Sequence, residues 1–205
     1  MRVLVTGSNG FIGKNLIVRL NELGISSVVF TRENSTKDLR ELIKKSDFVI
    51  HLAGENRPAD EKDFETVNTG LTLLICDEIR LTGKKIPIIL ASSVQAGCNN
   101  PYGKSKRAAE EVVEDFVNKT GNCAVIYRLP GVFGKWCKPN YNSVVATFCH
   151  NVARGLPIQV NDRAATLQLV YVDDVKYSLS LSTLNICPDS SFTSKSSITN
   201  GVFSL

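Results

Sequence analysis

Short apolar runs alternate with longer amphipathic segments along the first 127 residues of the chain. The apolar runs have the length of buried strands and cover residues 3–6, 27–30, 48–52, 87–91 and 124–127. Between them, apolar residues recur at helical spacing over residues 12–23, 37–45, 63–82 and 102–119. A glycine follows three of these segments, as is typical of helix ends: Gly24, Gly83 and Gly121. The pattern predicts strands and helices in regular alternation.

The expected strands are apolar without alternation, which is typical of a parallel sheet whose two faces are both covered. We therefore predict an α/β fold, a Rossmann-like doubly wound parallel sheet with helices on both faces. Ligands bind to such sheets beyond the carboxyl ends of the strands. Candidate chemistry is expected in the loops after Val5, Phe30, Leu52, Ala91 and Tyr127.

Composition and charge narrow the class of protein. A chain of 205 residues suffices for one domain with a small appended lobe. Its net charge of +4 is spread along the chain without a basic cluster, so no nucleic-acid partner is expected. The six cysteines include no C-x-x-C pair, and the two histidines, His51 and His150, are isolated, so no metal site is expected.

The N-terminal residues predict the compartment. Met1 and Arg2 lead directly into an apolar strand, without the apolar stretch and cleavage site of a signal peptide. No segment approaches the roughly 20 apolar residues that span a bilayer. Scattered cysteines are typical of a reducing compartment, so we predict a cytoplasmic protein without a membrane segment.

A glycine-rich loop, T-G-S-N-G-F-I-G-K, lies between the first strand and the first helix. In this context Gly7 permits the tight turn, Gly10 lets the backbone approach a pyrophosphate, and Gly13 allows close packing of helix on strand. A glycine-rich turn without a ligand is the alternative. The candidate cofactor-binding residues of the loop are Gly7, Asn9, Gly10, Phe11, Ile12 and Gly13.

The second strand ends in F-T-R-E-N, where a dinucleotide-binding fold reads the adenosine ribose. An acid there accepts from a free 2′-hydroxyl, whereas an arginine pairs with a 2′-phosphate. Arg32 occupies the usual position of the acid, so NADP(H) is favoured, while Glu33 leaves NAD(H) open. A solvated loop cation is the alternative reading of Arg32.

The segment N-P-Y-G-K-S-K opens the helix at 102–119. Tyr102 and Lys106 stand four residues apart on one helical face, so both side chains can face the same cleft. An adjacent ammonium and a cationic nicotinamide would lower the pKa of the Tyr102 phenol toward working pH, which suits a general acid. Taken alone, the segment also reads as an ordinary turn that opens a helix.

The loop T-G-S-N-G-F-I-G resembles the T-G-x-x-G-F-I-G fingerprint of the extended short-chain dehydrogenase/reductase superfamily. The resemblance implies that Leu52, Ala53 and Gly54 lie beside the cofactor, with tight packing as an equal alternative for the last two. It implies that Ser93, the second residue of the serine pair, orients the substrate oxygen, and that Asn68 supports the active-site loops. Ser93, Tyr102 and Lys106 thus form the expected catalytic group.

The segment R-L-P-G-V-F-G resembles the superfamily stretch that contacts nicotinamide and sugar. The resemblance implies a substrate contact from Arg128 and a cofactor contact from Leu129, although Gly131 stands where the superfamily has Asn. Asn142 and Ser143 precede an apolar helix whose N-terminus suits a substrate pyrophosphate. A purely structural cap is an equal alternative for these two residues.

Three motifs resemble a narrower branch of this superfamily: H-L-A-G-x-N-R-P, Y-G-K-S-K and the stretch 135–151. The resemblance covers residues 1 to about 176. That branch comprises nucleotide-sugar reductases of bacterial capsule and O-antigen synthesis. The resemblance implies NADPH-dependent reduction of the 4-keto group of a UDP-2-acetamido-2,6-dideoxy-hexulose, on the way to UDP-N-acetyl-L-fucosamine. Tyr102 would protonate the oxygen and Lys106 would hold the nicotinamide ribose.

Other functions remain open on the same fold. A dehydratase is disfavoured because Val94 and Gln95 stand where dehydratases carry an Asp-Glu pair. A nucleotide-sugar epimerase with tightly held NAD is the alternative enzyme, and a cofactor-binding protein without turnover is the alternative from another class. The resemblance also leaves a homodimer open.

The C-terminal sequence motivates that last alternative. We expect residues 1–175 to form the NAD(P)-binding domain, with 128–166 contributing part of a small, incomplete substrate lobe. Residues 176–205 are rich in Ser and Thr and lack a clear amphipathic period. They predict an atypical tail of a truncated or frame-disrupted chain that lacks the metal-binding cupin domain of the resembled branch.

Overall fold

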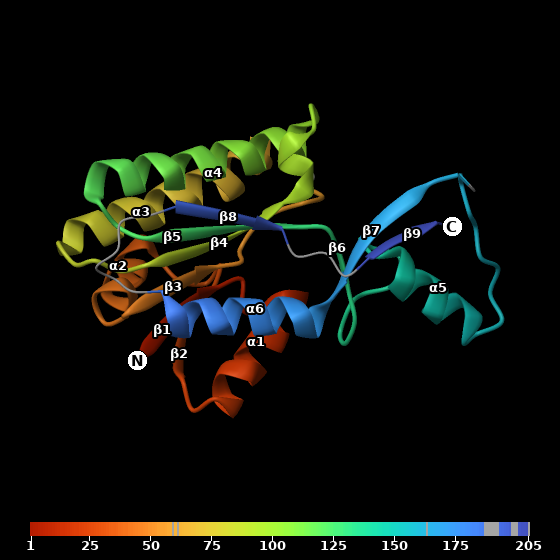
Figure 1. Cartoon of the computed structure of the whole chain (residues 1–205), viewed down its shortest axis with the longest axis horizontal. Coiled ribbons are helices and arrows are strands. Elements are labelled where there is room, and N and C mark those ends of the chain that lie inside the picture. Colours follow the sequence, from red (N-terminus) through yellow and green to blue (C-terminus); the bar gives the residue numbers. More distant parts are fainter. Residues whose placement is uncertain (59, 61, 163, 187–192, 198–200, 205) are drawn as a thin grey trace.

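The computed structural model describes residues 1–58, 60, 62–162, 164–186, 193–197 and 201–204. It shows a six-stranded sheet with helices on both faces and, at one end, a lobe built around a three-stranded sheet (Figure 1). The rest of the expected C-terminal tail, residues 187–192, 198–200 and 205, lies outside the described residues.

The large sheet is parallel throughout, in the order β2-β1-β3-β4-β5-β8. Its strands are β1 (Arg2–Thr6), β2 (Ser26–Phe30), β3 (Phe48–His51), β4 (Ile88–Ser93), β5 (Ala124–Leu129) and β8 (Thr193–Ser197). This doubly wound order reverses between β1 and β3, which opens a crevice at the carboxyl ends of those strands. The predicted fold class is confirmed, and β8 was not expected.

Helices cover both faces of the sheet (Figure 1). They are α1 (Phe11–Glu22), α2 (Thr36–Lys44), α3 (Leu71–Thr82), α4 (Pro101–Thr120) and α6 (Val172–Asn185). The segment 63–82, expected as one helix, begins as a π-helix, η1 (Phe64–Gly70), and continues as α3. A 3₁₀ turn, η2 (Val94–Gly97), joins β4 to α4.

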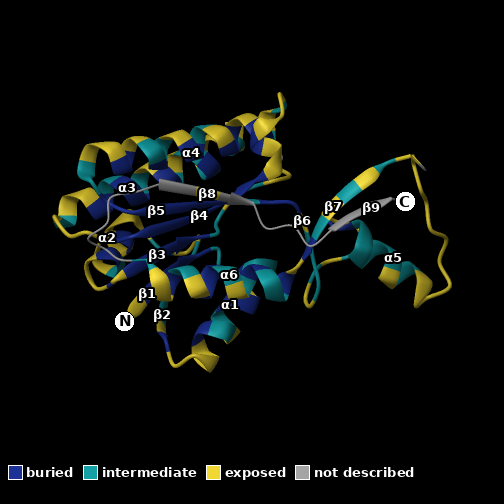
Figure 2. Cartoon of the chain, in the orientation of Figure 1, coloured by how far each residue is buried: buried dark blue, intermediate teal, exposed yellow. Residues whose placement is uncertain are grey.

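Successive residues of the strands point to opposite faces, so the sheet divides the core into two layers. Leu4, Val49 and Leu90 pack with α2, α3 and α4, whereas Val5 and Ile50 pack with α1 and α6. The central strands are buried along their whole length, as the continuous dark colour of β3 and β4 shows (Figure 2). Burial on both faces explains why the strands are apolar without alternation.

Helix α6 corrects one expectation. Residues 176–185, expected as the start of an irregular tail, belong to this helix, which buries Val172, Val175 and Leu179. Ser180 and Thr183 are also on the buried face of the helix, because each hydroxyl is hydrogen-bonded to the helix backbone. Ser180 Oγ donates to the Tyr177 carbonyl at 2.9 Å, and Thr183 Oγ1 donates to the Leu179 carbonyl at 2.8 Å. The apolar period was missed because these buried positions carry hydroxyls.

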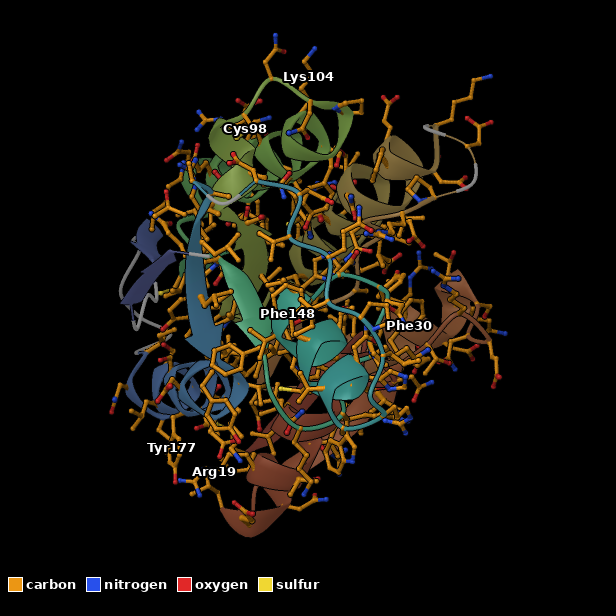
Figure 3. The ribbon with its side chains drawn as sticks, turned by 90° about the vertical axis from the view of Figure 1, so that its right-hand side faces the viewer. Arg19, Phe30, Cys98, Lys104, Phe148 and Tyr177 are labelled. Atoms are coloured by element: carbon orange, nitrogen blue, oxygen red, sulfur yellow. The ribbon has the colours of Figure 1, made fainter. Side chains whose placement is uncertain are left out.

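Helices α1 and α6 pack side by side on their face of the sheet. In Figure 3 the labelled side chains of Arg19, from α1, and Tyr177, from α6, point toward one another. The Arg19 guanidinium carbon lies 4.4 Å from the centre of the Tyr177 ring, a cation–π contact. Helix α6 is therefore part of the main fold around the large sheet.

The lobe lies beyond the carboxyl ends of the large sheet (Figure 1). It comprises β6 (Gly131–Phe133), α5 (Val144–Val152), β7 (Thr166–Tyr171) and β9 (Gly201–Ser204). Strand β7 pairs in parallel with β6 and antiparallel with β9. When the lobe faces the viewer, α5 with Phe148 lies in front of the large sheet (Figure 3). Among the described helices, none is long and apolar enough to cross a membrane.

Candidate active site

A cavity of about 1040 Å³ opens at the carboxyl ends of the strands, between the large sheet and the lobe. Its walls come from the glycine-rich loop, the loop after β3, the end of β4, the first turns of α4 and the segment that enters the lobe. Segments far apart in the sequence meet here because parallel strands all end at the same edge. The size of the cavity is that of a ligand-binding site.

The glycine-rich loop forms a tight cradle at the N-terminus of α1. Gly7 has φ +71°, and a Cβ there would lie 2.6 Å from the Ala53 nitrogen. A Cβ on Gly13 would lie 2.2 Å from the Gly7 carbonyl oxygen. Ser8 Oγ is buried and has no hydrogen-bond partner among the described residues. All six predicted loop residues line the cavity, so the cradle fits a nucleotide pyrophosphate: Gly7, Asn9, Gly10, Phe11, Ile12 and Gly13.

The loop after β3 closes the next wall. Leu52 and Gly54 line the cavity, whereas Ala53 is not among the described lining residues. The Ala53 N–H instead donates to Thr6 Oγ1 at 3.1 Å, which supports the packing alternative for this residue. A Cβ on Gly54 would lie 2.8 Å from Lys106 Nζ and 2.9 Å from Asn68 Oδ1. Gly54 is therefore needed for the lysine to reach the cavity.

The expected support role of Asn68 is confirmed. Its side-chain oxygen accepts from the Glu55 N–H at 2.8 Å, and its amide donates to the Glu55 carbonyl at 2.9 Å and to Ser105 Oγ at 2.9 Å. Ser105 Oγ in turn donates to the Tyr102 carbonyl at 2.8 Å. One buried amide thus ties the loop after β3 to the first turn of α4.

The start of α4 is held in place by its cap. Asn100 is the N-cap, its side-chain oxygen accepts from the Gly103 N–H at 2.7 Å, and Pro101 occupies the first helical position. A Cβ on Gly103 would lie 2.2 Å from the Gln95 carbonyl oxygen. The sequence P-Y-G therefore brings this turn of α4 against η2, directly after β4, and Tyr102 with it.

Ser93, Tyr102 and Lys106 all line the cavity. The Ser93 hydroxyl lies near enough to the Tyr102 phenol to lower its pKa. Lys106 Nζ lies 5.9 Å from the centre of the Tyr102 ring and donates to the Ala91 carbonyl at 3.2 Å. The structure thus brings the three expected catalytic residues together, from the end of β4 and one face of α4.

The protonation of Tyr102 differs from the expectation. Its pKa is raised above the ordinary value because burial disfavours the phenolate, and the nearby Ser93 hydroxyl only partly opposes this effect. Lys106 is not among the groups that shift the Tyr102 pKa. The expected lowering by Lys106 is therefore wrong for this structure, and the phenol is a protonated donor at neutral pH.

Lys106 is only 7% exposed. Burial lowers its pKa to about 8, and the Glu110 carboxylate acts in the opposite direction. An ammonium with this pKa is still largely charged at neutral pH but carries a desolvation cost. Such a perturbed pKa in a cavity is typical of a functional site.

The residue expected to read the ribose lies outside the cavity. Arg32 is 86% exposed at its side chain and donates to Glu55 Oε2 at 2.9 Å. Glu55 itself lines the cavity, and hydrogen bonds from Arg57 and Asn56 backbone groups and from Arg32 lower its pKa against the effect of burial. Arg32 therefore stands one ion pair away from the cavity wall.

Arg128, which was expected to contact the substrate, is not among the described residues that line the cavity. Its guanidinium forms a paired contact with Glu110 on α4, with Nε to Oε1 at 2.8 Å and Nη2 to Oε2 at 2.6 Å. The Glu110 side chain is 0% exposed and also accepts from Ser92 Oγ at 2.6 Å. A buried carboxylate needs such a partner, so Arg128 stabilises Glu110 in this structure.

On the lobe side, Leu129, Asn142 and Ser143 line the cavity. Ser143 is the N-cap of α5, and its Oγ accepts from the Ala146 N–H at 3.3 Å. Asn142 precedes the cap and leaves its side chain to the cavity mouth. Gly131 fits close to β7, because a Cβ there would lie 2.9 Å from Leu169 Cδ2.

Several residues at the cavity were not expected from the sequence. Arg57 and Lys138 add positive charge to its wall. Tyr141 Oη donates to Asn56 Oδ1 at 3.0 Å, across the mouth between the lobe and the large sheet. The aromatic and basic residues of the segment 135–141 were the available signal, but their direction depends on the tertiary structure.

Comparison with known proteins agrees with this site. Residues 3–176 match the model of the NAD dependent epimerase/dehydratase family. The chain belongs to this family. Its residues 1–58 and 62–162 supply five of the six strands of the parallel sheet, the glycine cradle and the Ser-Tyr-Lys group described above.

Within this family, the chain is 52% identical over 176 residues to the UDP-2-acetamido-2,6-beta-L-arabino-hexul-4-ose reductase of Pseudomonas aeruginosa. That match covers 85% of this chain and 47% of the relative. The expected resemblance to the narrow reductase branch is therefore confirmed. The chain spans about half the length of this relative.

Two solved structures share the fold. CapF, a capsular polysaccharide assembling protein from Staphylococcus aureus, is 36% identical with a TM-score of 0.77, over 99% of this chain and 54% of that chain. MoeE5, solved in complex with UDP-glucose and NAD, is 22% identical with a TM-score of 0.86, over 100% of this chain and 78% of that chain.

Proposed function

We propose that this chain is the nucleotide-binding and catalytic part of an NADPH-dependent reductase that acts on the 4-keto group of a UDP-2-acetamido-2,6-dideoxy-hexulose. The observation that carries the proposal is the meeting of Ser93, Tyr102 and Lys106 at one cavity with the glycine cradle. The identity of 52% to a UDP-sugar 4-keto reductase supports the choice of substrate.

The residues of the chain take separate roles in this reaction. A bound nicotinamide cofactor supplies the hydride that reduces the ketone carbon. Ser93 donates a hydrogen bond that orients the ketone oxygen, and the protonated Tyr102 phenol gives that oxygen its proton. Lys106, whose ammonium lines the same cavity, would hold the nicotinamide ribose.

The cationic wall suits the diphosphate of the sugar nucleotide. Lys138 and Ser143, at the N-terminus of α5, line the lobe side of the cavity, and Arg57 lines the opposite side from the loop after β3. Backbone N–H groups and basic side chains favour phosphate oxygens at such a position. We infer that the diphosphate lies here, which would place the sugar toward Ser93 and Tyr102.

The decisive experiment measures oxidation of NADPH by the chain when the 4-keto UDP-sugar is added. We expect turnover, and we expect Tyr102→Phe to lower it by about 10²–10⁴-fold because the proton donor is lost. Tyr127→Phe is the matched control, since this buried tyrosine bonds to Ser182 Oγ at 2.6 Å outside the cavity.

The other functions give different outcomes in the same assay. Binding of NADPH without sugar-dependent oxidation would overturn the reductase proposal and leave a cofactor-binding protein. Interconversion of UDP-sugar epimers without a net change at the nicotinamide absorbance band would favour an epimerase with tightly held NAD.

We also propose that Arg32 gives a preference for NADPH over NADH. A 2′-phosphate would take the place of Glu55 as the partner of this exposed guanidinium. We expect Arg32→Ala to weaken NADPH binding about tenfold and NADH binding little. Arg80→Ala is the control, because Arg80 is also exposed but pairs with Asp77 on α3. A preference for NADPH that survives Arg32→Ala would overturn this assignment.

A further inference from the structure

His51 lies at the carboxyl end of β3 and belongs to none of the roles above. It is 1% exposed, and both ring nitrogens have a hydroxyl partner: Nδ1 lies 2.7 Å from Thr6 Oγ1, and Nε2 lies 3.0 Å from Thr72 Oγ1. Thr6 directly precedes the glycine-rich loop, and Thr72 is on α3. A buried imidazole with two defined partners is a candidate for more than packing.

The neighbouring hydrogen bonds fix the direction of each proton. Thr72 Oγ1 donates to the Asn68 carbonyl at 2.6 Å, so its only proton is used and it must accept from His51 Nε2–H. At the other end, Thr6 Oγ1 accepts from the Ala53 N–H at 3.1 Å and can give its proton to His51 Nδ1. With the neutral Nε2–H tautomer, each donor and acceptor in these four hydrogen bonds has a partner.

The charge on His51 follows from the same surroundings. Burial lowers its pKa to about 3, and the positive charge of Lys106 acts in the same direction. An imidazolium would also deprive the Thr6 hydroxyl proton of its acceptor, because Nδ1 would then carry a proton of its own. His51 is thus held neutral beside the Lys106 ammonium.

The hydrogen-bonded chain continues beyond both threonines to the two halves of the candidate site. On one side, Thr6 and Ala53 border the glycine cradle and Gly54. On the other side, Asn68 holds Glu55 and Ser105, and Ser105 Oγ donates to the Tyr102 carbonyl. His51 is the link in this chain that joins β1 and β3 to the helices.

We propose that His51 is a positioning residue that sets the spacing between the glycine cradle and the face of α4 that carries Tyr102 and Lys106. The inference rests on the proposed function for its effect on turnover. It acts through Thr6 on the cradle and through Thr72 and Asn68 on α4.

The test interrupts the hydrogen-bonded network at one hydroxyl, with a substitution that keeps the shape of the side chain. Thr72→Val removes the acceptor for His51 Nε2–H and the bond to Asn68. Thr183→Val is the matched control, because Thr183 Oγ1 is also buried and also donates to the carbonyl four residues earlier, but in α6 outside the cavity. We expect Thr72→Val to weaken NADPH binding about fivefold and to lower turnover about tenfold, with Thr183→Val unchanged in both.

Equal NADPH affinity and equal turnover in the two variants would overturn the proposal, whatever their loss of stability. If the wild type oxidises no NADPH with the sugar, the reductase proposal fails, and the NADPH affinities still decide the positioning role. A second readout is the ¹⁵N spectrum of His51, expected to show the Nε2–H tautomer without titration between about pH 5 and pH 8. An Nδ1–H tautomer, or titration near the ordinary value, would contradict the proton directions.

The conservative exchange at His51 itself supplies a rescue. His51→Gln keeps a donor close to the position of Nε2, whereas His51→Leu has neither donor nor acceptor. We expect His51→Gln to retain more NADPH affinity and more turnover than His51→Leu. Equal losses in both variants would assign His51 to packing alone.

Discussion

Every residue of β3 and β4 is buried, whereas α5 in the lobe, although described along its whole length, has no buried residue. The large sheet has apolar layers on both faces, and the lobe contributes Val170 and little else to the buried core. The hydrophobic effect therefore stabilises the two regions very unequally. The large sheet carries its own stability, and the lobe depends on contacts around the cavity.

This difference separates two tasks of the candidate site. The cradle and the Ser-Tyr-Lys group stand on buried elements, which hold them in place before any ligand binds. The lobe side presents Tyr141 and Lys138 on exposed segments. We expect the cofactor half to be rigid and the sugar half to become ordered by its ligand, since regions with little buried surface open most readily.

The largest expected effect compares truncations in the two regions. Ile50→Ala removes a fully buried side chain from β3 and is expected to lower the free energy of unfolding by about 2–5 kcal/mol. Phe148→Ala on α5 is expected to cost about 1 kcal/mol or less, because that side chain is only partly buried. Urea unfolding at pH 7 measures both. A loss at Phe148 as large as that at Ile50 would show a core in the lobe.

The second effect is the pH dependence that His51 gives to the large sheet. Its pKa is about 3 in the folded protein and near 6.5 when unfolded, so the unfolded state binds the extra proton between these values. The free energy of unfolding should therefore fall as pH drops below 6.5, by about 1.4 kcal/mol per pH unit from this group. Urea unfolding from pH 7 to pH 5 should show a shallower slope in His51→Gln than in the wild type.

The third effect contrasts stability with activity at Lys106. Its folded pKa of about 8 lies below the ordinary 10.5, so burial of the ammonium costs stability below pH 8, and this cost disappears as pH rises from 8 to 10.5. Lys106→Met should raise the free energy of unfolding at pH 7 by about 1–3 kcal/mol while turnover is lost. A destabilised Lys106→Met would mean that the bond to the Ala91 carbonyl outweighs the desolvation.

The smallest effect tests the contact between the two regions. Tyr141→Phe removes only the hydroxyl that donates to Asn56, and it should weaken UDP-sugar binding by about 2–10-fold with NADPH binding unchanged. Tyr177→Phe, on the exposed face of α6, is the control. Calorimetric titration of each variant with the UDP-sugar and with NADPH measures both affinities. An equal effect on NADPH would show that the lobe also shapes the cofactor half.

The buried apolar runs predicted the sheet well, because continuous burial on both faces leaves a direct mark on the sequence. The expected strand at 124–127 is part of β5, and the expected helix at 102–119 is α4 to within a residue at each end. The lobe strands β6 and β7 were not predicted. Of their residues only Val170 is buried, and strands with so little burial carry a weak apolar pattern.

The sequence alone determined the local parts of the candidate site. The glycine spacing from Gly7 to Gly13 and the Tyr102–Lys106 pair are set by turn and helix geometry, which short sequences encode. The tertiary structure decided the rest: the raised pKa of Tyr102, the assignment of Arg128 to Glu110, and the place of His51 between Thr6 and Thr72. Burial and long-range hydrogen bonds depend on partners tens of residues away, and no local pattern names those partners.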